Sequence, residues 1–218
     1  MSAQMLKSNS VTPYVQYGCG LCAPREWTNY DTSPVLIART VPWVGNALAQ
    51  ATGAPEFPAN VRHGDIVAGL PVQDGTCRAI YCSHVLEHLS LDDLRIALAN
   101  TYRMLKPGGL FRFVLPDLRS IAATYVSSTD SDASHRFMLD AHLGVKHRPR
   151  GPMGLLRAWI GNSSHLWMWD YASLRAELIA AGFRDVRRAV HGDSEDDMFS
   201  LVEEESRWKG QLGMECVR

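Results

Sequence analysis

The sequence lacks the features of membrane-spanning, disulfide-stabilised and general nucleic-acid-binding proteins. Its longest uncharged stretches, 8–24 and 40–55, are broken by Pro, Gly, Asn, Gln and Ser, so neither supplies the roughly 20 mostly apolar residues of a membrane helix. Its five cysteines are odd in number and scattered, which argues against a disulfide framework and favours reduced thiols in a cytoplasmic protein. The formal net charge is -1, without the basic excess of a nucleic-acid binder.

The composition that remains is typical of one soluble globular domain. The chain has 218 residues, of which 46% are hydrophobic and 21% are charged, and this balance excludes general disorder. Its 17 glycines and 11 prolines are too few for a fibrous or low-complexity chain. We therefore expect a single domain over residues 1–218, whose oligomeric state the sequence leaves open.

Hydrophobic periodicity and turn residues predict strands that alternate with helices. The seven expected strands are 11–17, 27–31, 61–66, 79–83, 110–115, 183–190 and 212–217. The clearest expected helices are one that begins at Pro34 and ends by Pro42, one over 91–105 that Pro107-Gly108-Gly109 stops, and one over 171–181. This alternation predicts an α/β, doubly wound, mostly parallel seven-stranded sheet with helices on both faces.

The stretch over about 119–165 departs from this alternation. Forty-odd residues are too long for a simple connection, so we expect a helical insertion that serves either as a lid or as a structural subdomain. Its basic residues outnumber its acids; they include Arg136, His142, Lys146, His147, Arg148, Arg150 and Arg157. A lid of this charge would favour an anionic acceptor, whereas a solvated basic loop would have no such role.

Polar residues and glycines stand where the expected strands end. Gly18 and Gly20 follow the first strand, Asp31 ends the second, and Asp65 ends the third. Ligands of doubly wound folds bind beyond the carboxyl ends of the strands, so we expect these residues to share one site. Asp31 can accept two ribose hydroxyls, and Asp65 can accept an exocyclic amine beside Ile66.

Several motifs resemble the S-adenosylmethionine-dependent methyltransferases of the doubly wound class. They are 14–20 (YVQYGCG) with 27–31 (WTNYD), 70–74 (LPVQD), 82–89 (CSHVLEHL), 103–110 (RMLKPGGL), and 165–170 (HLWMWD) with 181–183 (AGF). The first resembles the shortened glycine loop of one bacterial branch. The sequence departs from the wider family at Gln16, where an acid is common, and at Cys22, where a third glycine is common. Only ten residues separate Gly20 from Asp31, which leaves no room for the usual helix.

The resemblance implies that S-adenosyl-L-methionine is the cofactor and that a small molecule or sugar is the methyl acceptor. The implied cofactor-binding residues are Tyr17, Gly18, Gly20, Asp31, Asp65, Ile66, Ser83 and His84. If the acceptor is a hydroxyl, a base must take its proton; His84 is the first candidate and His165 the second. The acceptor itself cannot be read from the sequence.

Three other interpretations compete with this one. His84 and His88 are four residues apart, but no further His or Cys is placed in sequence to complete a metal site, so we expect none. A nicotinamide reductase would need a glycine-rich loop that opens a helix and an acid about 20 residues later, and neither is present. A non-catalytic, cofactor-binding partner subunit stays open, because the fold does not fix the function.

Overall fold

The computed structural model describes residues 13–38, 56–144 and 164–218. Its strands are β1 (Tyr14–Tyr17), β2 (Thr28–Asp31), β3 (Val61–His63), β4 (Cys77–Ser83), β5 (Leu105–Leu115), β6 (Arg184–Ala189) and β7 (Leu212–Val217). Its α-helices are α1 (Pro34–Ala38), α3 (Leu91–Met104), α4 (Leu118–Ser127), α5 (Ala133–Asp140), α7 (Tyr171–Ala180) and α8 (Glu205–Trp208), with 3-10 helices η1 (Leu86–His88) and η2 (Asp197–Leu201). Within these ranges, no helix combines the length and apolar character needed to cross a bilayer.

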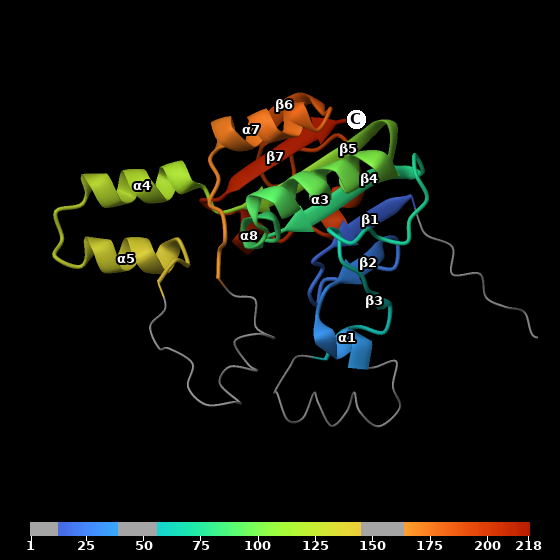
Figure 1. Ribbon diagram of the computed structural model, residues 1–218, viewed down its shortest axis with the longest axis horizontal. Coiled ribbons are helices and arrows are strands. Elements are labelled where there is room, and N and C mark those ends of the chain that lie inside the picture. Colours follow the sequence, from blue (N-terminus) through green and yellow to red (C-terminus); the bar gives the residue numbers. More distant parts are fainter. Residues whose placement is uncertain (1–12, 39–55, 145–163) are drawn as a thin grey trace, which may run out of the picture.

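The seven strands form one sheet in the order β3-β2-β1-β4-β5-β7-β6 (Figure 1). All neighbours pair in parallel except β7, which runs antiparallel to both β5 and β6. Tyr17 at the end of β1 lies opposite Tyr30 of β2 and Cys82 of β4, so these three strands end at the same edge. The predicted mostly parallel, doubly wound sheet is confirmed.

Both faces of the sheet are covered, as the alternation along β4 shows. Ile80 and Cys82 belong to the core that also contains apolar residues of α3 and α7. Ala79 and Tyr81 face the other way and pack in a second core, whose members include Trp27, Phe199 and Trp208. Because every second residue of a strand shares a face, one strand joins the two layers.

Two helices begin with side-chain caps. The Ser90 hydroxyl accepts the Asp93 N–H at 3.2 Å at the start of α3, and Asp170 forms a capping box with Ser173 at the start of α7. The stop after α3 differs from the expectation. β5 already begins at Leu105, which pairs with Cys77, and regular pairing resumes only at Leu110 opposite Ala79. The intervening Pro-Gly-Gly stretch is an irregularity within the strand.

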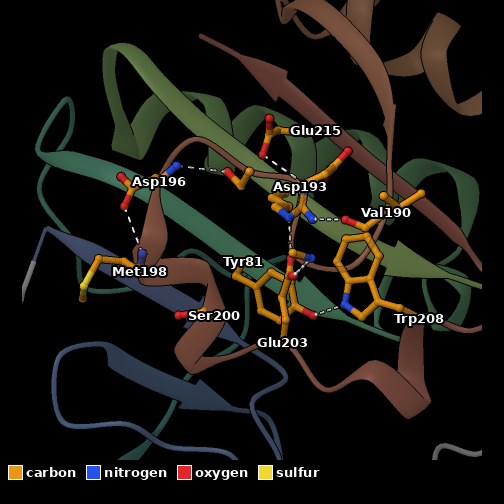
Figure 2. Close-up of polar contacts among 12 residues, drawn as sticks. Tyr81, Val190, Asp193, Asp196, Met198, Ser200, Glu203, Trp208 and Glu215 are labelled. Carbon is orange, nitrogen blue, oxygen red and sulfur yellow. Dashed lines mark hydrogen bonds and ion pairs between the residues drawn. The ribbon is translucent and has the colours of Figure 1, made fainter.

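A buried ion network anchors the C-terminal part of the chain to β5. The Arg112 side chain is fully buried and forms ion pairs with Glu203, with Asp193 at 2.8 Å and with Glu215 at 3.2 Å. Figure 2 shows these three carboxylates converging from β7 and from the segment before α8, next to the hydrogen bond from Trp208 to Tyr81. The network therefore fixes the segment that contains η2 and α8 against the sheet.

Candidate functional site

A cavity of about 980 Å³ opens at the edge where β1, β2 and β4 end. The structure brings all eight sequence-predicted cofactor residues to its wall: Tyr17, Gly18, Gly20, Asp31, Asp65, Ile66, Ser83 and His84. The Tyr17 hydroxyl is not available to a ligand in the cavity, because it lies in the core, 3.3 Å from the Thr101 hydroxyl. His165, the second base candidate, does not belong to this wall among the described residues.

The turn after β1 depends on its glycines. Gly18 and Gly20 have left-handed φ angles of 64° and 54°, which other residues adopt only with strain. A Cβ atom on Gly18 would lie 2.2 Å from a methyl group of Val85, whereas one on Gly20 would enter open space. The first glycine therefore allows close packing of the loop after β4, and the second keeps the cavity wide.

The Asp31 carboxylate is held in place by the backbone around it. Gly20 donates its N–H to Oδ2 at 3.0 Å, and Ser33 donates its N–H to Oδ1 at 2.9 Å. Each carboxylate oxygen can accept more than one hydrogen bond, so both keep capacity for a ligand hydroxyl. As the sequence predicts, the described residues between Gly20 and β2 form turns and no helix.

The loop after β3 supplies the next part of the wall. Asp65 accepts the Val67 N–H at 2.8 Å through Oδ1. Ile66 is buried beside it, and its carbonyl accepts a hydrogen bond from the Asn100 side chain at 2.8 Å. Val85 and Leu89 add apolar surface to the same cavity. A carboxylate next to aliphatic side chains suits a flat, amino-bearing ring.

The departures from the family pattern have structural roles. The buried Gln16 donates its amide N–H groups to the Cys22 carbonyl at 2.7 Å and to the Asn29 side chain at 2.5 Å, which ties the glycine turn to β2.

Burial, with a smaller effect from Asp31, raises the pKa of Cys19 to about 12. Cys19 is therefore a neutral thiol at physiological pH and not a thiolate nucleophile.

The opposite wall comes from a part of the chain to which the sequence analysis assigns no role. Val202, Glu204 and Arg207 line the cavity from the segment around η2 and α8. Arg207 donates to the Ser83 hydroxyl at 2.8 Å and to the Ser83 carbonyl at 3.0 Å. These partners are 124 positions apart, and no local spacing could have revealed them.

His84 lies at the cavity with both ring nitrogens facing protein groups. Its Nε2 is 3.1 Å from the Arg207 carbonyl, and its Nδ1 is 3.2 Å from Oε1 of Glu87. Its φ of 53° is left-handed, which is uncommon for a residue other than glycine. To act as a base towards an acceptor, His84 must exchange one of these partners.

Comparison with protein-family models matches residues 15–113 to the family described as a methyltransferase domain. Residues 15–113 are therefore similar to a methyltransferase domain. A SAM-dependent methyltransferase from Archaeoglobus fulgidus superposes with a TM-score of 0.52 at 16% identity, covering 95% of this chain and 86% of that one. A possible histamine N-methyltransferase from Thermotoga maritima gives 0.47 at 15% identity, with 94% and 81% covered. No curated protein matches the sequence.

The structure thus has the doubly wound methyltransferase fold that the sequence motifs predict, with the cavity at the expected edge. The match over 15–113 includes the glycine turn, both acids and the loop after β4. The matched region ends before the helical hairpin of α4 and α5 and before the cavity wall around Arg207, so the family model covers neither part.

His165 lies beside the cavity in a cluster of histidines. Its ring centroid is 5.0 Å from that of His88 and 4.6 Å from that of His142. Burial lowers the pKa of His165, which keeps the ring neutral at physiological pH. Glu87, His88 and His165 offer ligand atoms that all lie within 4.8 Å of one another. The fold therefore brings together three side chains of types that can bind a metal ion, which neighbours in the sequence do not reveal.

The hairpin of α4 and α5 projects away from the sheet (Figure 1), and no described residue of either helix lines the cavity. Arg136, one of the basic residues of the predicted lid, is paired with Asp130 and with Asp132. Lys146, His147, Arg148, Arg150 and Arg157 lie outside the described residues. Whether 119–165 acts as a lid stays a prediction.

Proposed function

We propose that the protein transfers a methyl group from S-adenosylmethionine to a small-molecule acceptor, with the cofactor in the cavity at the ends of β1, β2 and β4. One observation carries the proposal. The Asp31 carboxylate is fixed by two backbone N–H groups beside a glycine turn that leaves the cavity open. This arrangement suits a ribose diol.

The remaining wall fits the rest of the cofactor. Asp65 would accept a hydrogen bond from the adenine amino group, and Ile66, Val85 and Leu89 would cover the ring. The shortened loop after β1 offers no long helix N-terminus, but a sulfonium cofactor has no pyrophosphate that would need one. The glycine turn and Ser83 are left for the amino-acid end.

The cofactor supplies a methyl group that is already activated by the positive sulfur. The protein has to orient the acceptor in line with that methyl group and exclude water. For a hydroxyl acceptor, His84 would take the proton after exchanging one of its two partners. For a carboxylate or a neutral amine no base is needed, and His84 would only orient.

We propose an anionic small molecule or sugar as the acceptor, on the basic character of 119–165. Because Arg136 already pairs with two carboxylates, the attraction has to come from the basic residues of 146–157. Replacing Arg148 and Arg150 by Glu should raise the KM for the acceptor, more at low salt, without changing cofactor affinity. Unchanged acceptor kinetics at every salt concentration would exclude this charge preference.

Calorimetry with S-adenosylhomocysteine tests the cofactor site directly. We expect saturable binding to the wild type, at least tenfold weaker binding to Asp31→Ala, and unchanged binding to the control Asp92→Asn, whose side chain is 90% exposed. A methyl-transfer assay against pooled metabolites then tests catalysis, where His84→Ala should lower turnover about a hundredfold if His84 is the base. Cofactor binding without transfer to any acceptor would support the non-catalytic partner subunit instead.

A further inference from the structure

Glu87 carries a buried carboxylate that no donor satisfies within the described chain. The residue is fully buried, and neither carboxylate oxygen receives a hydrogen bond. Its backbone carbonyl, in contrast, accepts N–H groups of Leu166 and Trp167 at 2.8 and 3.2 Å. A carboxylate removed from water is strongly destabilised unless a positive charge or a metal faces it. A cation at this position would remove that cost.

The groups around this carboxylate are imidazoles and not lysine or arginine side chains. His88 and His165 place ring nitrogens within 4.8 Å of the Glu87 carboxylate and of each other. His84 adds a third ring, with Nδ1 at 3.2 Å from Oε1. Among the described residues, no lysine or arginine forms an ion pair with Glu87. One carboxylate with two or three imidazoles is a donor set that divalent transition metals prefer.

The hydrogen bond of His88 to the backbone leaves its other ring nitrogen with a lone pair. Nδ1 of His88 lies 3.1 Å from the Ser164 carbonyl, which can only accept, so Nδ1 carries the proton and Nε2 is left as a ligand. A backbone carbonyl on the outer nitrogen is the usual support of a metal-binding histidine.

The same argument applies to His84. Its Nε2 donates to the Arg207 carbonyl, so in the neutral ring the lone pair of Nδ1 faces the lone pairs of Glu87. That contact is repulsive unless the ring is doubly protonated or a cation lies close by.

We propose that Glu87, His88 and His165 bind one divalent transition metal ion, of which Zn²⁺ is the first candidate. Two more features belong to this cluster. His142 stacks on His165 at 4.6 Å with an interplanar angle of 28°. His84 and His142 account for two of the three described non-glycine residues with positive φ, and backbone strain of this kind gathers at functional sites.

The metal site adjoins the cavity, because His84 and His88 also line the cavity wall. A metal ion held by His88 would therefore lie next to the cavity. We assign the metal ion the role of binding an oxygen atom of the acceptor. This role rests on the proposed function, whereas the binding of the metal ion is independent of it.

The test is a metal titration of the full-length protein after treatment with a chelator. Calorimetry with ZnCl₂ should give one site per chain, and Co²⁺ should give the visible absorption bands of a low-symmetry, nitrogen- and oxygen-ligated ion. Glu87→Gln and His165→Gln should each weaken Zn²⁺ binding at least about tenfold, because each removes a ligand. His135→Gln, at an exposed position on α5, is the matched control and should bind like the wild type.

Glu87→Gln keeps the side-chain shape and removes the buried charge, so it should stay folded, and its thermal midpoint without metal should be no lower than that of the wild type. Zn²⁺ should raise the midpoint of the wild type but not that of this variant. Absence of saturable binding by folded wild type would overturn the proposal and leave protonated His84 as the partner of Glu87. Binding that survives in Glu87→Gln and disappears in Cys22→Ser would overturn it equally. Binding of S-adenosylhomocysteine, measured on the same samples, reports separately on the cofactor site.

Discussion

Asp31 combines two tasks, and a pair of variants can separate them. Asp31→Ala removes the acceptor of two backbone N–H groups, at 3.0 and 2.9 Å, which shape the glycine turn and the start of α1. Hydrogen bonds to a charged group contribute about 1.5 to 3 kcal/mol each when buried, but Asp31 is partly exposed and water can replace them. We therefore expect a loss of about 1 to 2 kcal/mol in the free energy of unfolding.

In a chain of this size, that loss should lower the thermal midpoint of the cofactor-free protein by about 2 to 8 °C. Asp31→Asn keeps one acceptor oxygen and the side-chain volume, so it should lose about half as much. Cofactor affinity should fall more than stability. Two hydrogen bonds to the ribose disappear in Asp31→Ala, and losing about 1.4 kcal/mol already means a tenfold higher Kd.

The assay is calorimetry with S-adenosylhomocysteine, combined with thermal melts of the same samples with and without it. The expected order of affinity is wild type, Asp31→Asn, Asp31→Ala, with at least tenfold between the first and the last. An unchanged Kd in both variants would refute the ribose contact. A normal Kd in Asp31→Asn with a weak one in Asp31→Ala would show that Asp31 acts only by shaping the loop.

Four further predictions follow from single contacts. Asp65→Asn keeps an acceptor oxygen and should weaken cofactor binding less than Asp65→Ala. If the inosine analogue of the cofactor binds the wild type as well as the cofactor itself does, the contact between Asp65 and adenine is excluded. Arg112→Met leaves Glu203 without its cation, although Arg187 still pairs with Asp193 and Glu215, and should cost about 3 to 5 kcal/mol, a drop of about 6 to 20 °C in a thermal melt; an unchanged midpoint would contradict the role given to the ion network. Burial acts to raise the pKa of Asp193, but Arg187 and Arg112 lower it below its ordinary value. The ionised Asp193 therefore stabilises the fold above about pH 4, and this contribution is lost as the pH falls below that. In thermal melts at a series of pH values, Asp193→Asn should show a smaller fall of the midpoint on the acid side than the wild type. Iodoacetamide should alkylate the exposed Cys22 first and the buried Cys19 slowly, and bound S-adenosylhomocysteine should protect Cys22, as peptide mass spectrometry would show.

Local chemistry accounts for the features that the sequence predicts well. Ser90 and Asp170 mark helix starts because a side-chain oxygen there accepts an N–H of the first turn. Asp31 and the two glycines gather at one edge because parallel neighbouring strands end together. These relations need only a few residues of sequence, and the same holds for the strand over 212–217, which the structure gives with identical bounds.

Contacts between distant parts of the chain account for what the sequence does not predict. The pairing of Arg207 with Ser83, the ion network of Arg112, and the approach of His165 to Glu87 each join segments far apart in the chain. No periodicity encodes such contacts, because they depend on how whole layers pack. The expectation that no metal site is present rested on the spacing of His and Cys along the sequence, and it stays a prediction. The side chains of Glu87, His88 and His165 come together only in the folded chain, so sequence spacing could not reveal their cluster.

The position of β7 between β5 and β6 constrains when the sheet can be completed while the chain is being synthesised. Residues 212–217 follow every other strand in the chain, yet they pair with β5 along their whole length and with β6 along most of it. A ribosome adds about 5 to 20 residues per second, so β5 stays without one hydrogen-bonded partner for several seconds after it emerges. During that interval the nascent chain exposes a long apolar strand edge, the kind of surface that pairs with other chains. Chaperone binding to the nascent protein should therefore end only when β7 has left the ribosome.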